Sequence, residues 1–266
     1  MSDATEADLF DSSHVDLRRR RAVQEIAAGI RSAGLVTFSG LASRPEVLGF
    51  AEQVMSVARH RDSGPDRLTA IYDTGQHAER PGFAGFTNRE LALHTEGSAL
   101  NTPPRLMLLV CSEPALRGGH TLLADGRRLH ADLARRCPDA VAVLSNPRAA
   151  LFGSSGGIFA PVISLHQEGG VSVRLRQDEF VRWSPLAQMH LHLLRATAAR
   201  HQQMIVLRAG DGLLLDNHRW LHARTAYEGA RLYYRALGSA RFSLGPGFLP
   251  QRTEPGSHWA AASDAV

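Results

Sequence analysis

The stretch MIVLRAGDGLLLDNHRWLHARTAYEGARLYYRAL, residues 204–237, decides the fold class. It consists of short runs of branched and aromatic residues, separated by turn residues at 210–212 and 228–229. Such runs between Gly-containing turns are typical of antiparallel strands. The stretch therefore predicts four short strands, over residues 204–208, 212–215, 222–227 and 231–237.

The rest of the chain continues this pattern toward the N-terminus. Further strands are predicted over residues 35–38, 68–72, 105–111, 121–124, 162–165 and 171–175, and helices over residues 15–31, 44–58, 126–136 and 185–202. Many short strands without a strand–helix–strand rhythm favour a mostly β protein with flanking helices, built as a double-sheet barrel or jelly roll. We expect one domain over residues 1–266, with disordered tails at 1–15 and 254–266.

The composition excludes some classes of protein. Two cysteines in 266 residues favour a reducing compartment, the cytoplasm, over a disulfide framework. No apolar run reaches the ~18 residues of a membrane span. The net charge is only +4, and the one dense basic run is Arg18–Arg21. We interpret this run as a solvated helix face and expect no nucleic-acid partner; a nucleic-acid-binding arm is the alternative, and it predicts salt-dependent binding.

His94-Thr95-Glu96 is the first part of a candidate metal site. Side chains two residues apart on an extended segment point to the same side, so one imidazole and one carboxylate can reach one ion. His222 lies in a run of strand-forming residues and can supply the third ligand. Two imidazoles and one carboxylate on one face of an ion leave three positions open, which is typical of iron(II) oxygenases. Zinc is the alternative metal, but the helical His-Glu-x-x-His motif of zinc proteases is absent from the sequence.

Two arginines follow the second histidine. Arg231 lies nine residues after His222, and Arg235 shares its strand face four residues later. An inward-facing guanidinium is costly unless it binds an anion, and its fork geometry suits a carboxylate. The alternative is a pair of surface arginines on an edge strand. Two inward arginines predict two anionic groups to be bound.

Four motifs in order resemble the taurine dioxygenase and clavaminate synthase-like family of iron(II)- and 2-oxoglutarate-dependent oxygenases. They are His94-Thr95-Glu96, Gly118-Gly119-His120-Thr121, Leu221-His222-Ala223-Arg224-Thr225 and Arg231-Leu232-Tyr233-Tyr234-Arg235. The resemblance covers about residues 30–240 and implies a distorted double-stranded β-helix, a cupin-like jelly roll. Glu in place of the more common Asp is similar to the clavaminate synthase-like branch, whereas halogenating relatives carry Gly or Ala there.

The resemblance also implies roles for individual residues. Iron(II) would be held by His94, Glu96 and His222, while 2-oxoglutarate and O2 serve as cosubstrates. Arg231 and Thr121 would bind 2-oxoglutarate. Arg235 would bind the substrate; because the separation between His222 and Arg231 is short for this branch, Arg235 is the alternative 2-oxoglutarate anchor.

We expect a small substrate, an amino acid or a related carboxylate-bearing building block of a natural product. Hydroxylation is the expected outcome, and desaturation, cyclisation or a non-catalytic metal-binding cupin-like protein are the alternatives. Asp178 and Glu179 could meet a substrate amine, or they could pair with neighbouring arginines at 174, 176 and 182. The irregular stretches 60–90 and 153–157 are candidate lids.

Overall fold

The computed structural model describes residues 8–77 and 80–251, and two antiparallel sheets form its centre. The larger sheet has the order β1-β14-β5-β17-β2, with β3 also paired to β17, and the smaller has the order β13-β7-β15-β4. The strands of the larger sheet are β1 Leu35–Phe38, β2 Met55–Val57, β3 Thr69–Ile71, β5 Leu106–Glu113, β14 Gly212–Asp216 and β17 Leu232–Ala240. Those of the smaller sheet are β4 Leu91–His94, β7 Thr121–Asp125, β13 Gln202–Ile205 and β15 Trp220–Arg224.

Short strands and helices complete the chain. Three smaller pairings are β10 with β11, β8 with β9 and β12, and β6 with β16. Their bounds are β6 Arg117–Gly118, β8 Ala150–Phe152, β9 Ile158–Ala160, β10 Ile163–Leu165, β11 Val171–Val173, β12 Val181–Trp183 and β16 Tyr227–Glu228. The helices are α1 Leu9–Ser12, α2 Ala22–Ser32, α3 Arg44–Val54, α4 Gly126–Arg136, α5 Pro138–Leu144 and α6 Pro185–Arg200, with a 3₁₀ turn at Ala84–Phe86.

Strand β5 shows how the sequence builds two layers at once. Its side chains alternate between the two faces of the sheet, as a period of two requires. Leu106, Leu108 and Val110 pack into a core that includes residues of α2 and α3. Met107 and Leu109 pack into a second core, with side chains of β7, β13 and β15. The continuous apolar run of β5 therefore reflects burial on both faces.

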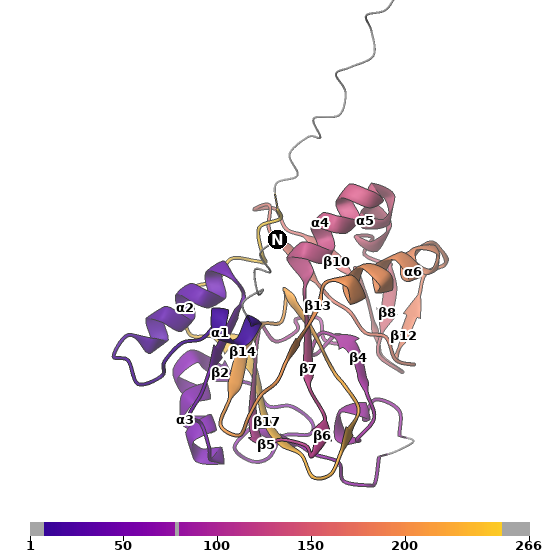
Figure 1. Cartoon of the computed structure of the whole chain (residues 1–266). Coiled ribbons are helices and arrows are strands. Elements are labelled where there is room, and N and C mark those ends of the chain that lie inside the picture. The colour runs from indigo at the N-terminus through magenta and orange to yellow at the C-terminus, as the bar shows by residue number, and fades with distance from the viewer. Residues whose placement is uncertain (1–7, 78–79, 252–266) are drawn as a thin grey trace, which may run out of the picture.

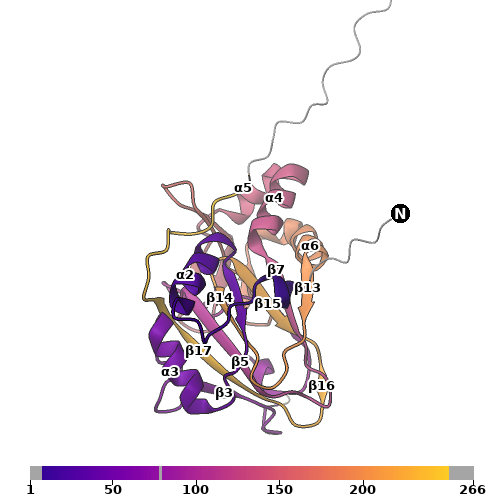
Figure 2. The same ribbon diagram turned by 60° about the vertical axis from the view of Figure 1, so that its left-hand side comes forward.

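Helices cover both outer sides of the sheets. Figure 1 shows α2 and α3 beside the larger sheet, and α4, α5 and α6 on the other side of the molecule, above the smaller sheet. Figure 2 shows the same arrangement from a second direction. The third core joins α4, α5 and α6 to side chains of β8, β11 and β15. The space between the two sheets is thus the interior of a barrel that helices enclose from outside.

The N-terminal region differs from the prediction. Residues 8–15 are not a disordered tail: α1 lies here, and Val15 N–H donates to the Thr37 carbonyl at 2.9 Å. Helix α2 begins at Ala22 instead of residue 15. Val15 and Leu17 pack against the core, but their spacing of two reflects an extended segment. The remaining tail residues, 1–7 and 254–266, lie outside the described residues.

In the rest of the described chain, the predicted helices and strands mainly begin or end at residues other than those expected. The helix expected over 44–58 ends at Val54, and Met55–Val57 forms β2. Strands β8, β9 and β12 and helix α5 were not predicted. No helix in the described ranges is long and apolar enough to cross a membrane. Arg18–Arg21 precede α2 and are exposed, and Arg18 pairs with Asp16 at 3.0 Å.

Candidate active site

The three residues predicted to bind a metal lie together. His94 ends β4, and its partner across the ladder with β15 is His222. Their ring centroids are 4.2 Å apart, and His222 Nε2 is 3.5 Å from Glu96 Oε1. One ligand atom from each residue lies within 4.8 Å of the other two, and no other group of three His, Cys, Asp or Glu residues in the described part of the chain does this. Sheet pairing therefore brings residues 94 and 222 to one site, with Glu96 just beyond the end of β4.

The imidazole of His94 is oriented by its own strand. Its Nδ1 lies 2.9 Å from the Ala92 carbonyl oxygen. Because a carbonyl only accepts, Nδ1 carries the proton and Nε2 is left as the ligand atom. Burial, followed by the proximity of His222, lowers the pKa of His94 to about 4. His94 is therefore neutral near pH 7, as a metal ligand must be.

Glu96 is held as a carboxylate in the same place. Burial alone would raise its pKa, but the Arg235 guanidinium and the nearby His222 imidazole more than offset this and hold the pKa well below its usual range. Arg235 Nη1 donates to Glu96 Oε1 at 2.5 Å. Both ring nitrogens of His222 are buried without a hydrogen-bond partner among the described residues. A charged carboxylate beside two imidazole nitrogens with free lone pairs fits a divalent metal ion.

Arg231, four residues before Arg235, is a buried cation. It is 5% exposed, and its guanidinium carbon lies 3.6 Å from the ring centroid of Tyr233 and 5.4 Å from that of Tyr227. Burial lowers its pKa, and its Nε has no hydrogen-bond partner in the described ranges. A Cβ on Gly119 would come within 3.1 Å of Arg231 Cδ. The guanidinium is thus fixed between two rings with donor capacity left over, which suits a ligand carboxylate.

Thr121 belongs to the motif that borders Arg231. It is buried in β7, two residues after Gly119, and its ladder partner in β15 is Arg224. Asp178 does not offer a free carboxylate, because both of its oxygens accept from Arg176, at 2.5 and 2.7 Å.

Arg224 has a role that the sequence did not indicate. It is 5% exposed and donates hydrogen bonds to four main-chain carbonyls, those of Ala84, Gly85, Thr87 and Arg89. Burial, followed by the nearby charge of Arg231, lowers its pKa to about 10. These carbonyls belong to the loop that leads into β4. Arg224 therefore ties the strand of His222 to the segment that precedes His94.

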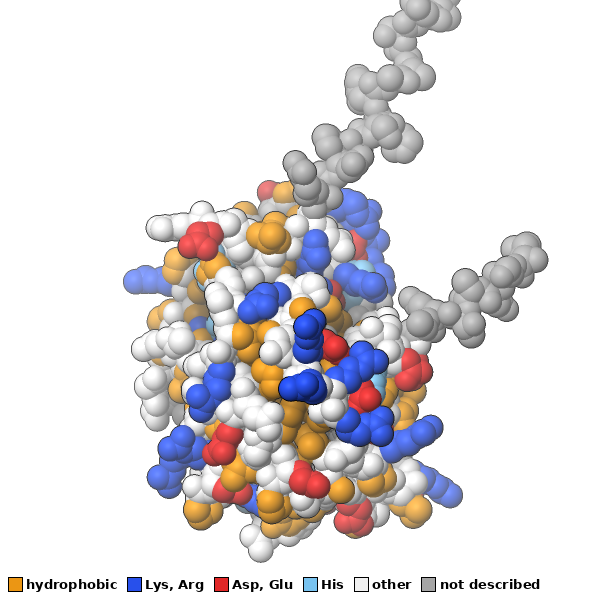
Figure 3. Space-filling view, turned by 90° about the vertical axis from the view of Figure 1, so that its left-hand side faces the viewer, with side chains coloured by type: hydrophobic (Ala, Val, Ile, Leu, Met, Phe, Trp, Pro, Cys, Tyr) orange, Lys and Arg blue, Asp and Glu red, His pale blue; other side chains and the backbone are white. Residues whose placement is uncertain are grey.

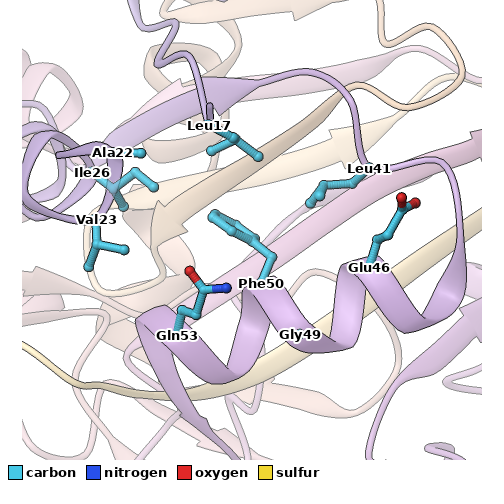
Figure 4. A pocket seen from close by; sticks show the side chains of 9 residues that line it. All are labelled: Leu17, Ala22, Val23, Ile26, Leu41, Glu46, Gly49, Phe50 and Gln53. Atoms are coloured by element: carbon cyan, nitrogen blue, oxygen red, sulfur yellow. The ribbon is translucent and has the colours of Figure 1, made fainter. Parts of the chain in front are cut away.

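A separate pocket lies outside the barrel, between α2 and α3 (Figure 4). Its only acidic lining residue, Glu46, accepts hydrogen bonds from Ser43 in the N-terminal cap of α3. Figure 3 shows the face over these helices, where basic side chains are interspersed with acidic and apolar ones. The other lining residues are Leu17, Ala22, Val23, Ile26, Leu41, Gly49, Phe50 and Gln53. This pocket has no group of metal-ligating side chains.

The match to a protein family extends over nearly the whole barrel. The profile described as "Taurine catabolism dioxygenase TauD, TfdA family" matches residues 3–237. The chain belongs to this family. The predicted membership of a family of iron(II)- and 2-oxoglutarate-dependent dioxygenases is therefore confirmed.

Sequence relatives of this TauD/TfdA-family protein are also dioxygenases by name. A uridine-5'-phosphate dioxygenase of Streptomyces sp. is 27% identical over 197 residues, which cover 67% of this chain and 71% of the relative. Dioxygenase str8 of Strobilurus tenacellus is 29% identical over 163 residues, which cover 54% of this chain. That match spans only 36% of the length of str8.

Solved structures show the fold. The non-heme iron oxygenase OrfP, in complex with iron, succinate and (3S)-hydroxy-L-Arg, gives a TM-score of 0.66 at 15% identity and covers 82% of this chain and 80% of its own. Asparagine oxygenase, in complex with Fe(II), 3-hydroxyasparagine and succinate, gives 0.64 at 16% identity, with 81% and 78% covered. The predicted mostly β, cupin-like jelly roll is confirmed. The roles of individual residues stay predictions.

Proposed function

We propose that this chain is a dioxygenase that uses iron(II), 2-oxoglutarate and O2 to hydroxylate a small carboxylate-bearing molecule, such as a free amino acid. The single observation that carries the proposal is the cluster of His94 with the buried Glu96 and His222, in which Arg235 is hydrogen-bonded to Glu96. The three side chains could bind one metal ion, and the Arg235 guanidinium lies directly beside them. Family membership and the names of the relatives support the class of reaction.

Each proposed ligand is prepared by its surroundings. His94 presents Nε2 because Nδ1 is bonded to the Ala92 carbonyl, and Glu96 stays ionised beside Arg235. When bound, iron(II) with 2-oxoglutarate and O2 supplies the oxidising chemistry, and 2-oxoglutarate is converted to succinate and CO2. The protein orients both organic molecules and limits the access of water.

The two arginines divide the anionic groups between them. Arg231, fixed between Tyr227 and Tyr233, would hold the distal carboxylate of 2-oxoglutarate, with the Thr121 hydroxyl as a further donor. Arg235 would bind a carboxylate of the substrate, because its Nε has no partner among the described residues and only Nη1 contacts Glu96. This position beside the proposed metal ligand would place the substrate close to the reacting centre.

A phosphate-bearing substrate is the second candidate. The observation that favours it is the sequence match with uridine-5'-phosphate dioxygenases, which extends over 67% of this chain in one case. A guanidinium binds phosphate by the same forked geometry as it binds carboxylate. Arg235 would then meet a phosphate oxygen.

Succinate release tests the proposal. The protein, with iron(II), 2-oxoglutarate and O2, is assayed against a panel of free L-amino acids and uridine 5'-phosphate. We expect one class to stimulate succinate formation and to yield a product heavier by one oxygen atom. His94→Ala should abolish this activity, whereas His192→Ala, on the exposed part of α6, should retain it. Zinc retained after anaerobic purification, with no 2-oxoglutarate consumption, would contradict the proposal and favour a non-catalytic metal protein.

A further inference from the structure

Glu96 lies beyond the end of β4, where the main chain has no ladder hydrogen bonds to a neighbouring strand. Strand β4 ends at His94, and the ladder with β15 pairs His94 with His222 but does not extend to Glu96. Nevertheless, Glu96 is buried, and its backbone N–H and carbonyl both need partners. A proposed metal ligand thus depends on something other than a strand neighbour for its position.

The side-chain amide of Asn217 takes the place of that neighbour. Its Oδ1 accepts from Glu96 N–H at 2.7 Å, and its Nδ2 donates to the Glu96 carbonyl at 3.0 Å. Nδ2 also donates to the Pro104 carbonyl at 2.8 Å. One amide therefore satisfies both backbone groups of Glu96, as a residue of an adjacent antiparallel strand would.

Asn217 is itself rigidly placed. It is 1% exposed, and its backbone N–H donates to the Arg105 carbonyl at 2.9 Å. The preceding residue, Asp216, forms a two-point ion pair with Arg105, at 2.7 and 2.8 Å. Asn217 also belongs to the turn between β14 and β15, five residues before His222. The amide therefore connects the main chain at Glu96 to the hairpin that carries His222.

We propose that Asn217 is a positioning residue that sets the place of the Glu96 carboxylate relative to His222. The inference rests on the proposed metal-binding role of these residues. Without the amide, the buried N–H and carbonyl of Glu96 and the partly buried carbonyl of Pro104 would lose a partner, which is costly where water has little access. The segment at Glu96 would shift to find other partners, and the carboxylate would move away from the two imidazoles.

The test compares Asn217→Ser with Trp220→Phe. The serine hydroxyl is too short to bond both backbone groups of Glu96. Trp220→Phe removes a different, partly buried hydrogen bond, from Nε1 to the Ala33 carbonyl at 2.9 Å, on the strand that carries His222. Metal-free proteins are titrated anaerobically with Fe(II) and with Co(II), whose visible absorption reports coordination geometry, and the melting temperature is measured in parallel.

We expect Asn217→Ser to bind both ions about 10- to 100-fold more weakly, because losses of this size are typical when a residue that orients a metal ligand is replaced. The Co(II) spectrum should also change. Trp220→Phe should melt at a lower temperature but bind metal as the wild type does. If Asn217→Ser matched the wild type in affinity and spectrum, or if Trp220→Phe weakened binding equally, the inference would be wrong. A wild-type protein that bound neither ion would instead overturn the proposed function.

Asn217→Asp provides a second variant should the serine variant not fold. It keeps the side-chain volume and an acceptor for Glu96 N–H, but it cannot donate to the two carbonyls. Its added negative charge would by itself strengthen the binding of a cation. A loss of metal affinity in this variant would therefore support the positioning role, and unchanged or tighter binding with the wild-type spectrum would contradict it.

Discussion

Arg235 contacts Glu96 directly: its Nη1 donates to Oε1 at 2.5 Å, across 139 residues of sequence. The contact joins β17 of the larger sheet to the segment that follows β4 of the smaller one. Arg231, four residues earlier, instead lies between two tyrosine rings. The two inward arginines therefore have different surroundings: Arg235 lies within β17, whereas Arg231 immediately precedes this strand.

Conservative variants should distinguish the roles of Arg231 and Arg235. Lysine keeps the charge but loses the fork that binds a carboxylate at two points. We expect Arg231→Lys to raise the KM for 2-oxoglutarate about tenfold or more, with a smaller effect on the substrate. Arg235→Lys should chiefly raise the substrate KM and increase the 2-oxoglutarate consumed per product formed. Steady-state kinetics, with 2-oxoglutarate and the substrate varied in turn, checks this prediction. The opposite result for the two variants would exchange the two assignments.

Gly119 and Gly156 offer a matched pair for the 2-oxoglutarate site. Both have positive φ, +69° and +85°, so alanine should cost each about 1–2 kcal/mol of stability. Only at Gly119 would the new Cβ approach Arg231, at 3.1 Å from Cδ and Nε, whereas no atom lies within 4 Å at Gly156. We expect Gly119→Ala alone to raise the KM for 2-oxoglutarate severalfold. Equal KM values in the two variants would argue that Arg231 does not bind this cosubstrate.

Residues that belong to a regular apolar pattern or to a motif could be predicted from the sequence. Residues whose side chains hydrogen-bond to distant backbone groups could not. The continuous apolar run of β5 and the His94-Thr95-Glu96 motif are visible in the order of side chains. Arg224, in contrast, bonds only to backbone carbonyls of a distant loop, and any residue type can supply a carbonyl. The amide of Asn217 is hidden for the same reason, because it bonds to the backbone of Glu96.

The helix predicted over residues 44–58 ends at Val54, and a strand follows it directly. Met55 and Val57 are buried and Ser56 is exposed, which is the alternation of a strand, yet these residues directly follow a helix. The ladder with Gly238–Ala240 of β17 decides in favour of the strand. That pairing is about 180 residues away in sequence and leaves no local signal.

Arg224→Lys should loosen the loop that leads to His94. One ammonium cannot replace a guanidinium that donates to four carbonyls, so buried carbonyls would lose their partners. We expect a loss of about 2–3 kcal/mol in the free energy of unfolding. Amide hydrogen exchange over residues 84–90 should become faster than elsewhere. Arg89→Lys, an exposed change in the same loop, is the control and should leave both measurements near the wild-type values.

Acidification should destabilise the metal-free protein before its carboxylates are protonated. Burial lowers the pKa of His130 and of His218 below the usual value of 6.5. The unfolded chain therefore binds protons near pH 6 that the folded chain does not, so the stability is complete above about pH 6.5 and declines as the pH falls through it. Melting temperatures at pH 7.5 and 5.5 should show this decline, and His218→Gln should reduce it. His192→Gln, at an exposed position on α6, should behave as the wild type. An identical decline in His218→Gln and the wild type would exclude His218 as a source of the pH dependence.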